Sequence, residues 1–380
     1  MAIEEAVETT AAKLISRERV TDAAATLFSD ADDSGQIPER FVRIGADDGE
    51  AAGEVVVGED EAFELPVVDM AKLQDPELSA LETAKLGAAC RDWGFFQLTS
   101  HGVDEEVIRH MKGSTAEFFR LPLETKNAIA FGGDDTFNGF GHHFNRGGPS
   151  EGGKLDWAEC VLLITQPVEG RKMEMWPANP PSFRNALDKY SLEITDLTRR
   201  LLRFMAADLG VSEEALVGAF FYSNNGAAVK GQSVAIHHYP PCRQPEKVLG
   251  ITPHTDGLGL TVLLHADDTP GLQVKREGRW FPVRPMPEAL VVNVGDILEV
   301  LTNGAYGSVE HRVVPDAENG RTTVVMFQDA SIDGMVAPLP ELLDGDDARA
   351  RYISTGKLEY TKGHFVALAE GARFLDNLKK

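Results

Sequence analysis

The sequence predicts an α+β, mainly β protein whose core is a double-stranded β-helix, or jelly roll, with a helical region before it and helices after it. From residue 226 to 338 the chain consists of short alternating apolar runs separated by Gly, Pro, Asn and Asp, which is typical of a double-sheet jelly roll. Before this region, residues 182–209 carry apolar side chains at helical spacing over a long stretch. We therefore expect one long helix that braces the sheet.

The N-terminal part is expected to combine helices with short strands. Residues 1–62 indicate one or two short amphipathic helices, followed by an acidic linker rich in Gly and Ala. We assign the aromatic side chains of the apolar block at 93–96 to the core. The elements predicted for the N-terminal α/β region, 63–225, are a strand at 65–69, helices at 76–92 and 103–120, a strand at 93–96 and a helix restart at 121–124.

The predicted jelly-roll domain, 226–338, is followed by a C-terminal helical region, 339–380. A hairpin is expected at 274–283, because Glu277-Gly278 interrupts two apolar runs there. The other elements predicted in these two regions are strands at 289–294 and 297–301, on either side of Gly295-Asp296, and helices at 339–352 and 364–379.

Composition excludes several classes of protein. The 380 residues carry a formal net charge of -23, which argues against binding to a phosphate backbone. The three cysteines are far apart and odd in number, as expected for reduced thiols rather than a disulfide framework. Neither a signal peptide nor an apolar run of membrane-spanning length is visible. We expect a monomer in the cytoplasm or the nucleus, without nucleic-acid or membrane partners.

A metal site is indicated by His254 and Asp256. Both flank a predicted strand end, where residues two apart point the same way, so the two side chains converge while Thr255 turns aside. An isolated H-x-D pair is usually a strand histidine near a turn aspartate. However, His311 lies on a second predicted strand and completes a set of two histidines and one carboxylate, the facial triad of non-haem iron(II) oxygenases. The absence of thiolates argues against structural zinc.

An anion site is indicated by Arg321 and Thr323. They face the same way at the start of the apolar run 321–327, and an inward-facing arginine on a buried strand is costly unless an anion meets it. The guanidinium suits a carboxylate, and the threonine hydroxyl adds a donor. An ordinary buried pair between arginine and an acidic residue is the structural alternative. A co-substrate carboxylate explains the arginine, the threonine and the triad together.

The chain resembles the plant 2-oxoglutarate- and Fe(II)-dependent dioxygenases, of the branch that includes flavonoid, gibberellin and alkaloid oxidases and senescence-related-protein-like members. The resemblance covers roughly residues 36–375, and the motifs occur in the order of the family. They are W-G-F-F-Q-L-T-S-H-G-V at 93–103, H-H-Y-P-P-C at 237–242, H-T-D-G-L-G-L-T-V-L-L at 254–264, N-G-A-Y-G-S-V-E-H-R at 303–312 and R-T-T at 321–323.

This resemblance implies Fe(2+), 2-oxoglutarate as co-substrate and O2, with ascorbate needed for full activity. It also implies that His254, Asp256 and His311 are the catalytic metal ligands. The far carboxylate of 2-oxoglutarate would meet Arg321, Thr323, Tyr239 and His237. The chain departs from the family at two of these positions, because Arg-x-Thr replaces Arg-x-Ser and His237 replaces an asparagine that often touches the co-substrate. The threonine keeps the hydroxyl, whereas the histidine would have to bond the same oxygen through a ring nitrogen.

The substrate pocket is predicted to involve the Gly-rich loop at 132–153, the strand end near Phe327 and the C-terminal helices. Candidate lining residues are Phe140, Phe144 and Phe327. The implied function is hydroxylation, desaturation or demethylation of a small, largely apolar plant metabolite or hormone, with release of succinate and CO2. Two alternatives stay open, namely an oxidase of the same fold that does not use 2-oxoglutarate, as in ethylene-forming relatives, and a catalytically silent binding module.

Overall fold

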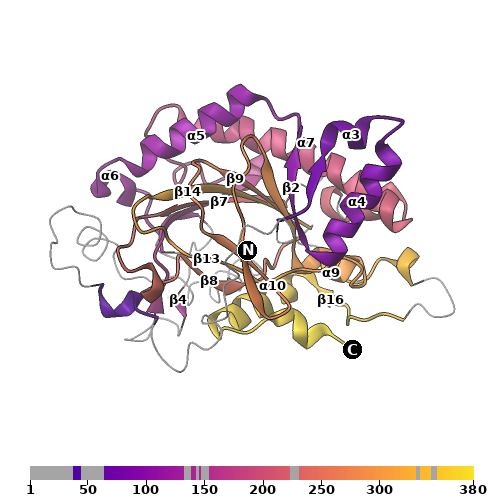
Figure 1. Ribbon diagram of the computed structural model, residues 1–380. Helices are drawn as coiled ribbons and strands as arrows, with labels where there is room; N and C mark the ends of the chain where they lie inside the picture. The colour runs from indigo at the N-terminus through magenta and orange to yellow at the C-terminus, as the bar shows by residue number, and fades with distance from the viewer. Residues whose placement is uncertain are drawn as a thin grey trace.

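A computed structural model describes residues 37–43, 64–131, 138–142, 145–146, 154–222, 231–330, 334–343 and 349–380. The predicted helices of the N-terminal arm, the acidic linker and Phe144 lie outside these residues. Two β-sheets of unequal size dominate the described part (Figure 1). Within it, none of the helices is both long and apolar enough to cross a membrane.

The larger sheet has eight strands in the order β1-β2-β12-β9-β14-β7-β6-β3. All its neighbouring strands are antiparallel except β1 and β2, which are parallel. The sheet therefore draws strands from both sides of residue 226, and the predicted division into 63–225 and 226–338 stays a prediction about domains. The bounds are β1 Val67–Asp69, β2 Phe95–Thr99, β3 Gly139–Gly141, β6 Glu159–Gln166, β7 Gly231–Tyr239, β9 Leu260–His265, β12 Leu290–Val294 and β14 Arg321–Asp329.

The smaller sheet has four strands in the order β11-β10-β13-β8. Its hairpin confirms the expected turn, since both Glu277 and Gly278 have positive φ, at 51° and 77°. The bounds are β8 Ile251–His254, β10 Leu272–Arg276, β11 Arg279–Pro282 and β13 His311–Val313, and two short pairs complete the strands, β4 Asn145–Arg146 with β5 Lys154–Leu155 and β15 Met335–Val336 with β16 Thr355–Gly356.

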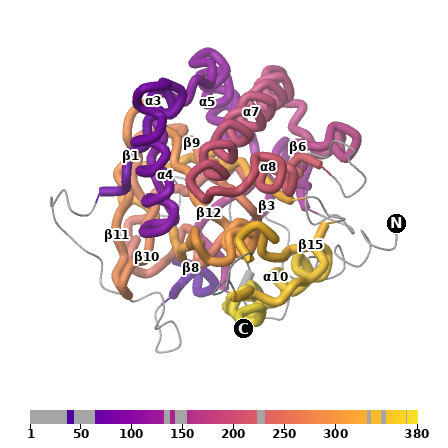
Figure 2. Tube along the Cα trace, turned by 90° about the vertical axis from the view of Figure 1, so that its right-hand side faces the viewer, coloured from indigo at the N-terminus to yellow at the C-terminus, as the bar shows by residue number. Residues whose placement is uncertain are grey.

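Helices cover the outer face of the larger sheet. The long helix predicted at 182–209 is α7, Phe183–Leu209, and Gly210 ends it with a positive φ of 70°. Both views show α5 and α7 on one side of the molecule and α10 on the opposite side (Figures 1 and 2). The helices are α3 Met70–Gln74, α4 Ser79–Asp92, α5 Glu105–Phe119, α6 Leu123–Asn127, α7, α8 Glu213–Phe221, α9 Asp296–Leu301 and α10 Lys357–Ala369, with short 3-10 turns η1 Glu39–Phe41, η4 Val168–Gly170, η5 Pro245–Lys247, η6 Pro340–Leu342 and η7 Phe374–Leu378.

Alternation along β14 separates the core from the interior of the jelly roll. Val324 and Met326 are buried in the main core, beneath the helices. Val325 and Phe327 instead line a cavity on the other face of the strand. The larger sheet thus has one face for the core and one for a site, as the period of two requires.

Three predictions about secondary structure are wrong. Residues 297–301 belong to helix α9 instead of a strand. The run Ile-Leu-Glu-Val-Leu is buried on every side, so its sequence shows no helical period. The described part of 339–352 contains only the short turn η6, and the C-terminal helix begins at 357 and not at 364. Gly356, at the start of α10, carries no side chain that could have marked this boundary.

Candidate active site

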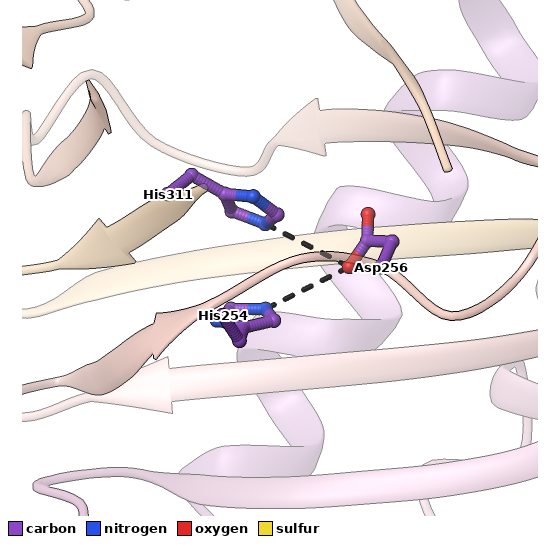
Figure 3. A group of neighbouring side chains, drawn as sticks. All are labelled: His254, Asp256 and His311. Carbon is purple, nitrogen blue, oxygen red and sulfur yellow. Dashed lines mark ion pairs between the residues drawn. The ribbon is translucent and has the colours of Figure 1, made fainter. Parts of the chain in front are cut away.

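His254, Asp256 and His311 come together between the two sheets. His254 ends β8 and His311 begins β13, and the two are direct cross-strand partners. Asp256 follows in the loop two residues after β8. Its Oδ1 lies 3.6 Å from His254 Nε2 and 3.7 Å from His311 Nε2, so all three ligand atoms point to one place (Figure 3).

Both histidines are oriented by backbone carbonyl groups. His254 Nδ1 lies 2.8 Å from Thr252 O, and His311 Nδ1 lies 3.2 Å from Val309 O. A carbonyl oxygen can only accept, so Nδ1 carries the proton and each Nε2 keeps its lone pair for a metal. Burial, followed by the proximity of His311, lowers the pKa of His254 to about 4, so this imidazole is neutral at pH 7.

Asp256 is held so that a single oxygen is left for a ligand. Its Oδ2 accepts hydrogen bonds from Thr261 Oγ1 at 2.6 Å and from Asn293 Nδ2 at 2.7 Å. Burial by itself raises the pKa of Asp256, but the two histidines and these two hydrogen bonds outweigh it and hold the pKa below its ordinary value. Asp256 is therefore a carboxylate, with Oδ1 turned toward the histidines.

The donor set fits iron(II). Among the described residues, these three side chains form a group that lies close enough together to hold a metal ion. Their ligand atoms lie within 4.8 Å of one another. Two imidazoles and one carboxylate are the ligands of non-haem iron oxygenases, and the three protein ligands leave further positions for other molecules. The free cysteines are all buried elsewhere.

Arg321 and Thr323 form the second polar region, as the alternation of β14 predicts. Arg321 is 1% exposed, and its three guanidinium nitrogens make no well-formed hydrogen bond to the described residues. Thr323 Oγ1 likewise makes no well-formed hydrogen bond, although the Tyr239 hydroxyl lies close to it, whereas the Thr322 hydroxyl turns away and lies 3.1 Å from His238 Nδ1. The predicted alternative, an ordinary ion pair with an acidic residue, is not formed within the described chain. A buried, uncompensated guanidinium fits an anionic ligand.

Neighbouring strands place further polar side chains beside this pair. Tyr239 and His237 on β7 are the cross-strand partners of Arg321 and Thr323. The guanidinium carbon lies 5.2 Å from the centre of the Tyr239 ring, and burial lowers the pKa of Arg321. The structure thus places Tyr239 and His237, both predicted from the sequence to bind the co-substrate, beside Arg321 and Thr323.

His265 was missed. It is the partner of Thr323 on β9, only 7% exposed, and neither ring nitrogen has a hydrogen-bond partner in the described chain. Burial, followed by the charge of Arg321, lowers its pKa to about 3. Its spacing of two and four residues from Leu263 and Thr261 puts it on the same face of β9, but only the structure shows that this face lines the cavity and meets Thr323. We call Arg321, Thr323, Tyr239, His237 and His265 the arginine cluster.

Comparison with known proteins identifies the family. The sequence model of the 2OG-Fe(II) oxygenase superfamily matches residues 230–330, and that of the non-haem dioxygenase in morphine synthesis N-terminal region matches 65–179. Protein SRG1 of Arabidopsis thaliana is 38% identical over 343 residues, which cover 90% of this chain and 92% of the relative. The chain belongs to the 2OG-Fe(II) oxygenase superfamily. It is a 2-oxoglutarate-dependent dioxygenase that uses Fe(II).

Other relatives of this dioxygenase are similar over most of their length. The 2-oxoglutarate-dependent dioxygenase 11 of Oryza sativa subsp. japonica is 37% identical, over 94% of this chain and 95% of the relative. A crystal structure of JOX2 in complex with 2OG, Fe and JA has a TM-score of 0.78 and 28% identity, over 94% of this chain and 97% of that chain. These similarities confirm the jelly-roll fold.

The dioxygenase has a cavity of about 550 Å³ that reaches both the triad and Arg321. Phe327 lines it. Phe140 does not, because β3 turns this side chain into the core, where it packs edge-on against Phe118 with ring centres 5.9 Å apart. Its neighbour Asn138 lines the cavity instead. Phe140 is therefore corrected from a pocket residue to a core residue.

Phe95 differs from its prediction in the opposite direction, because the sequence analysis placed it in the core alone. It lies on β2, lines the cavity and packs edge-on against His311, with ring centres 5.1 Å apart. Phe96, the next residue, faces the main core. The alternation of the strand separates the two aromatics, and only the pairing of β2 with β12 places Phe95 beside the triad.

Helix α10 of the dioxygenase forms one wall of the cavity. His364 lies directly over Gly257, where an added Cβ would displace the His364 ring. The side chains of α10 that line the cavity are Lys357, Thr361, His364, Phe365 and Leu368. The C-terminal segment therefore contributes to the site, as the resemblance implied.

Proposed function

We propose that His254, Asp256 and His311 bind Fe(II), and that the arginine cluster binds the far carboxylate of 2-oxoglutarate. When bound, iron and 2-oxoglutarate supply the oxidising chemistry, in which decarboxylation of the co-substrate to succinate and CO2 is coupled to oxidation of a substrate C–H bond by dioxygen. The observation that supports this most strongly is Arg321, buried at 1% exposure without an acidic ion-pair partner in the described chain, in a cavity shared with the triad.

The protein side chains have separate tasks in this proposal. The carbonyl groups of Thr252 and Val309 hold the Nδ1 atoms of the histidines, so that each Nε2 is directed toward Asp256, where it can ligate the metal. Arg321 and Thr323 orient the co-substrate by two-point contact with its carboxylate, as a guanidinium fork does. Phe95 covers one side of His311 and limits the access of water to it.

We further propose a small, largely apolar metabolite or hormone as the substrate, hydroxylated, desaturated or demethylated. The cavity walls support this, since Phe327 of β14 and Phe365 and Leu368 of α10 all line the cavity. Relatives whose names state a substrate support this substrate class. One of them is the oxoglutarate-dependent flavonoid 7-O-demethylase 1 of Ocimum basilicum, which is 37% identical over 83% of this chain. We expect a monomeric protein of the cytoplasm or nucleus, without nucleic-acid or membrane partners, in keeping with its charge of -23.

Anaerobic titration of the purified protein with Fe(II) and 2-oxoglutarate tests the proposal. The expected result is the weak visible charge-transfer band of the chelate, with one equivalent of each component. Iron binding without the band would favour the oxidase that does not use 2-oxoglutarate. Failure to bind iron would favour a silent binding module. Once the band is seen, release of succinate in the presence of candidate metabolites identifies the substrate.

A further inference from the structure

Arg373 connects the C-terminal segment to helix α9. It lies after α10, and its Nη2 donates to Asp296 Oδ1 at 2.8 Å and to Glu299 Oε2 at 3.0 Å. Its Nε reaches the same Asp296 oxygen at 3.3 Å. The two carboxylates are buried, with 0% and 7% exposure. One guanidinium therefore compensates two acidic side chains that are shielded from water.

Asp296 holds the loop that carries Asp256. The backbone N–H of Asp296 donates to Asp256 O at 2.7 Å, and that of Ile297 donates to Leu258 O at 3.1 Å. In addition, Thr255 Oγ1 donates to Asp296 Oδ2 at 3.2 Å. The free N–H groups at the start of α9 are thus satisfied by the metal-ligating loop, and the first side chain of the helix is the one that Arg373 binds.

Glu299 makes the matching connection to His311. Its Oε2 accepts a hydrogen bond from the N–H of Ser308 at 2.6 Å, and Arg373 Nη2 donates to the carbonyl oxygen of Ser308 at 3.2 Å. Ser308 precedes Val309, whose carbonyl oxygen orients the His311 ring. Arg373 is therefore in contact with the supports of both segments that supply the triad.

We propose that Arg373 is a positioning residue for the metal site, acting through Asp296 and Glu299 on the segments that carry Asp256 and His311. This inference rests on the proposed metal site. Without the guanidinium, two buried carboxylates would lie together uncompensated, which is strongly unfavourable. The structure would relieve this by admitting water, and this change alters hydrogen bonds that hold the ligand segments.

The same segment forms the wall of the cavity. Tyr360 of α10 donates to Asp296 Oδ2 at 3.4 Å, and His364 and Phe365 on the same helix line the cavity. Docking of this wall and the geometry of the metal ligands thus depend on one ion-pair cluster. A perturbation of the C-terminal segment is expected to reach the metal, even though Arg373 is not among the residues that line the cavity.

The test compares Arg373→Gln with wild type in two measurements that need no turnover. The first is titration of the metal-free protein with Co(II) alone, which suits the same donor set and absorbs in the visible range. The second is thermal unfolding of the metal-free protein. We expect Co(II) to bind about 10- to 100-fold more weakly, as is usual when residues that support metal ligands are removed. Arg351→Gln, which alters an exposed arginine of the same segment, should bind as wild type does.

Arg373→Lys separates positioning from simple stability. Lysine keeps the charge but not the two-pronged geometry, so its Co(II) affinity should lie between wild type and Arg373→Gln. A folded Arg373→Gln protein with wild-type Co(II) affinity would overturn the inference, whatever its unfolding temperature. If that variant does not fold, Arg373→Lys decides by the same criterion. If wild type itself binds neither Co(II) nor Fe(II), it is the proposed function that has failed.

Discussion

The triad and the arginine cluster both border the cavity, but they differ in how far their polar atoms are hydrogen-bonded within the protein. Each ligand of the triad is oriented by hydrogen bonds, from Thr261 and Asn293 to Asp256 and from the histidines to backbone carbonyl oxygens. The guanidinium of Arg321 and the hydroxyl of Thr323 lie beside Tyr239 and make no hydrogen bond of good geometry within the described chain. The metal ligands are thus preorganised, whereas Arg321 still lacks an anionic partner.

This difference implies different responses to mutation. Removal of a triad residue deletes a ligand, and removal of its supports loosens the geometry. Removal of Arg321 deletes an interaction that exists only in the complex, and also removes a buried charge from the free protein. The predictions that follow test this contrast.

Asp256→Ala is expected to have the largest effect. It removes the one anionic ligand, so the charge-transfer band and succinate formation should both fall below detection. Asp376→Ala, at an exposed aspartate of η7, is the matched control and should behave as wild type. A band of wild-type intensity in Asp256→Ala would show that the triad is not the metal site.

Arg321→Met should mainly raise the requirement for 2-oxoglutarate. Truncation of one partner of a buried charge pair costs about 2–5 kcal/mol, which corresponds to a KM for 2-oxoglutarate raised about 30-fold or more. Without 2-oxoglutarate, the variant should unfold at the same temperature as wild type or higher, since an unpaired buried charge is gone. Arg276→Met, outside the cavity, is the control. Unchanged 2-oxoglutarate kinetics would remove Arg321 from the co-substrate site.

Thr261→Val tests the preorganisation of Asp256. The change is nearly isosteric and removes one of the two hydrogen bonds to Oδ2, so we expect metal affinity to fall about 10-fold, at the lower end of the usual range for such supports. Equilibrium titration of the metal measures it. Thr99→Val, which removes a hydroxyl bonded to Val68 O, provides the control. Equal affinity in both variants would mean that Asp256 does not need this hydrogen bond.

The last prediction concerns pH and the arginine cluster. The pKa of His265 is about 3 in the folded protein, against an ordinary value of 6.5. At pH values between these two, His265 binds a proton in the unfolded chain but not in the folded protein. The contribution of His265 to the free energy of unfolding therefore falls as pH drops, by up to about 1.4 kcal/mol per pH unit. His265→Gln should therefore flatten the pH dependence of the free energy of unfolding between pH 6.5 and 4. Replacement of the exposed His110 should not, and an unchanged slope would place His265 in contact with water.

Much of the site could be predicted from local pattern. The spacing of His254 and Asp256, and the alternation of Arg321 and Thr323, follow from the period of two in strands. The same rule could not decide which face of β2 meets the triad, so Phe95 was assigned to the core with Phe96. It also could not exclude Phe140, because an aromatic residue near a Gly-rich loop suits a core as well as a pocket.

The sequence by itself determined the fold class, the chemistry of the donor set and the long helix α7, because periodicity and residue type act locally. The tertiary structure decided what depends on contacts between distant segments. The pairing of β9 with β14 placed His265 beside Thr323. The contact between the start of α9 and the loop that carries Asp256 placed Asp296 within reach of Arg373. Burial on all sides also hid the helical character of 297–301. These features arise from packing between segments, for which a local pattern has no signal.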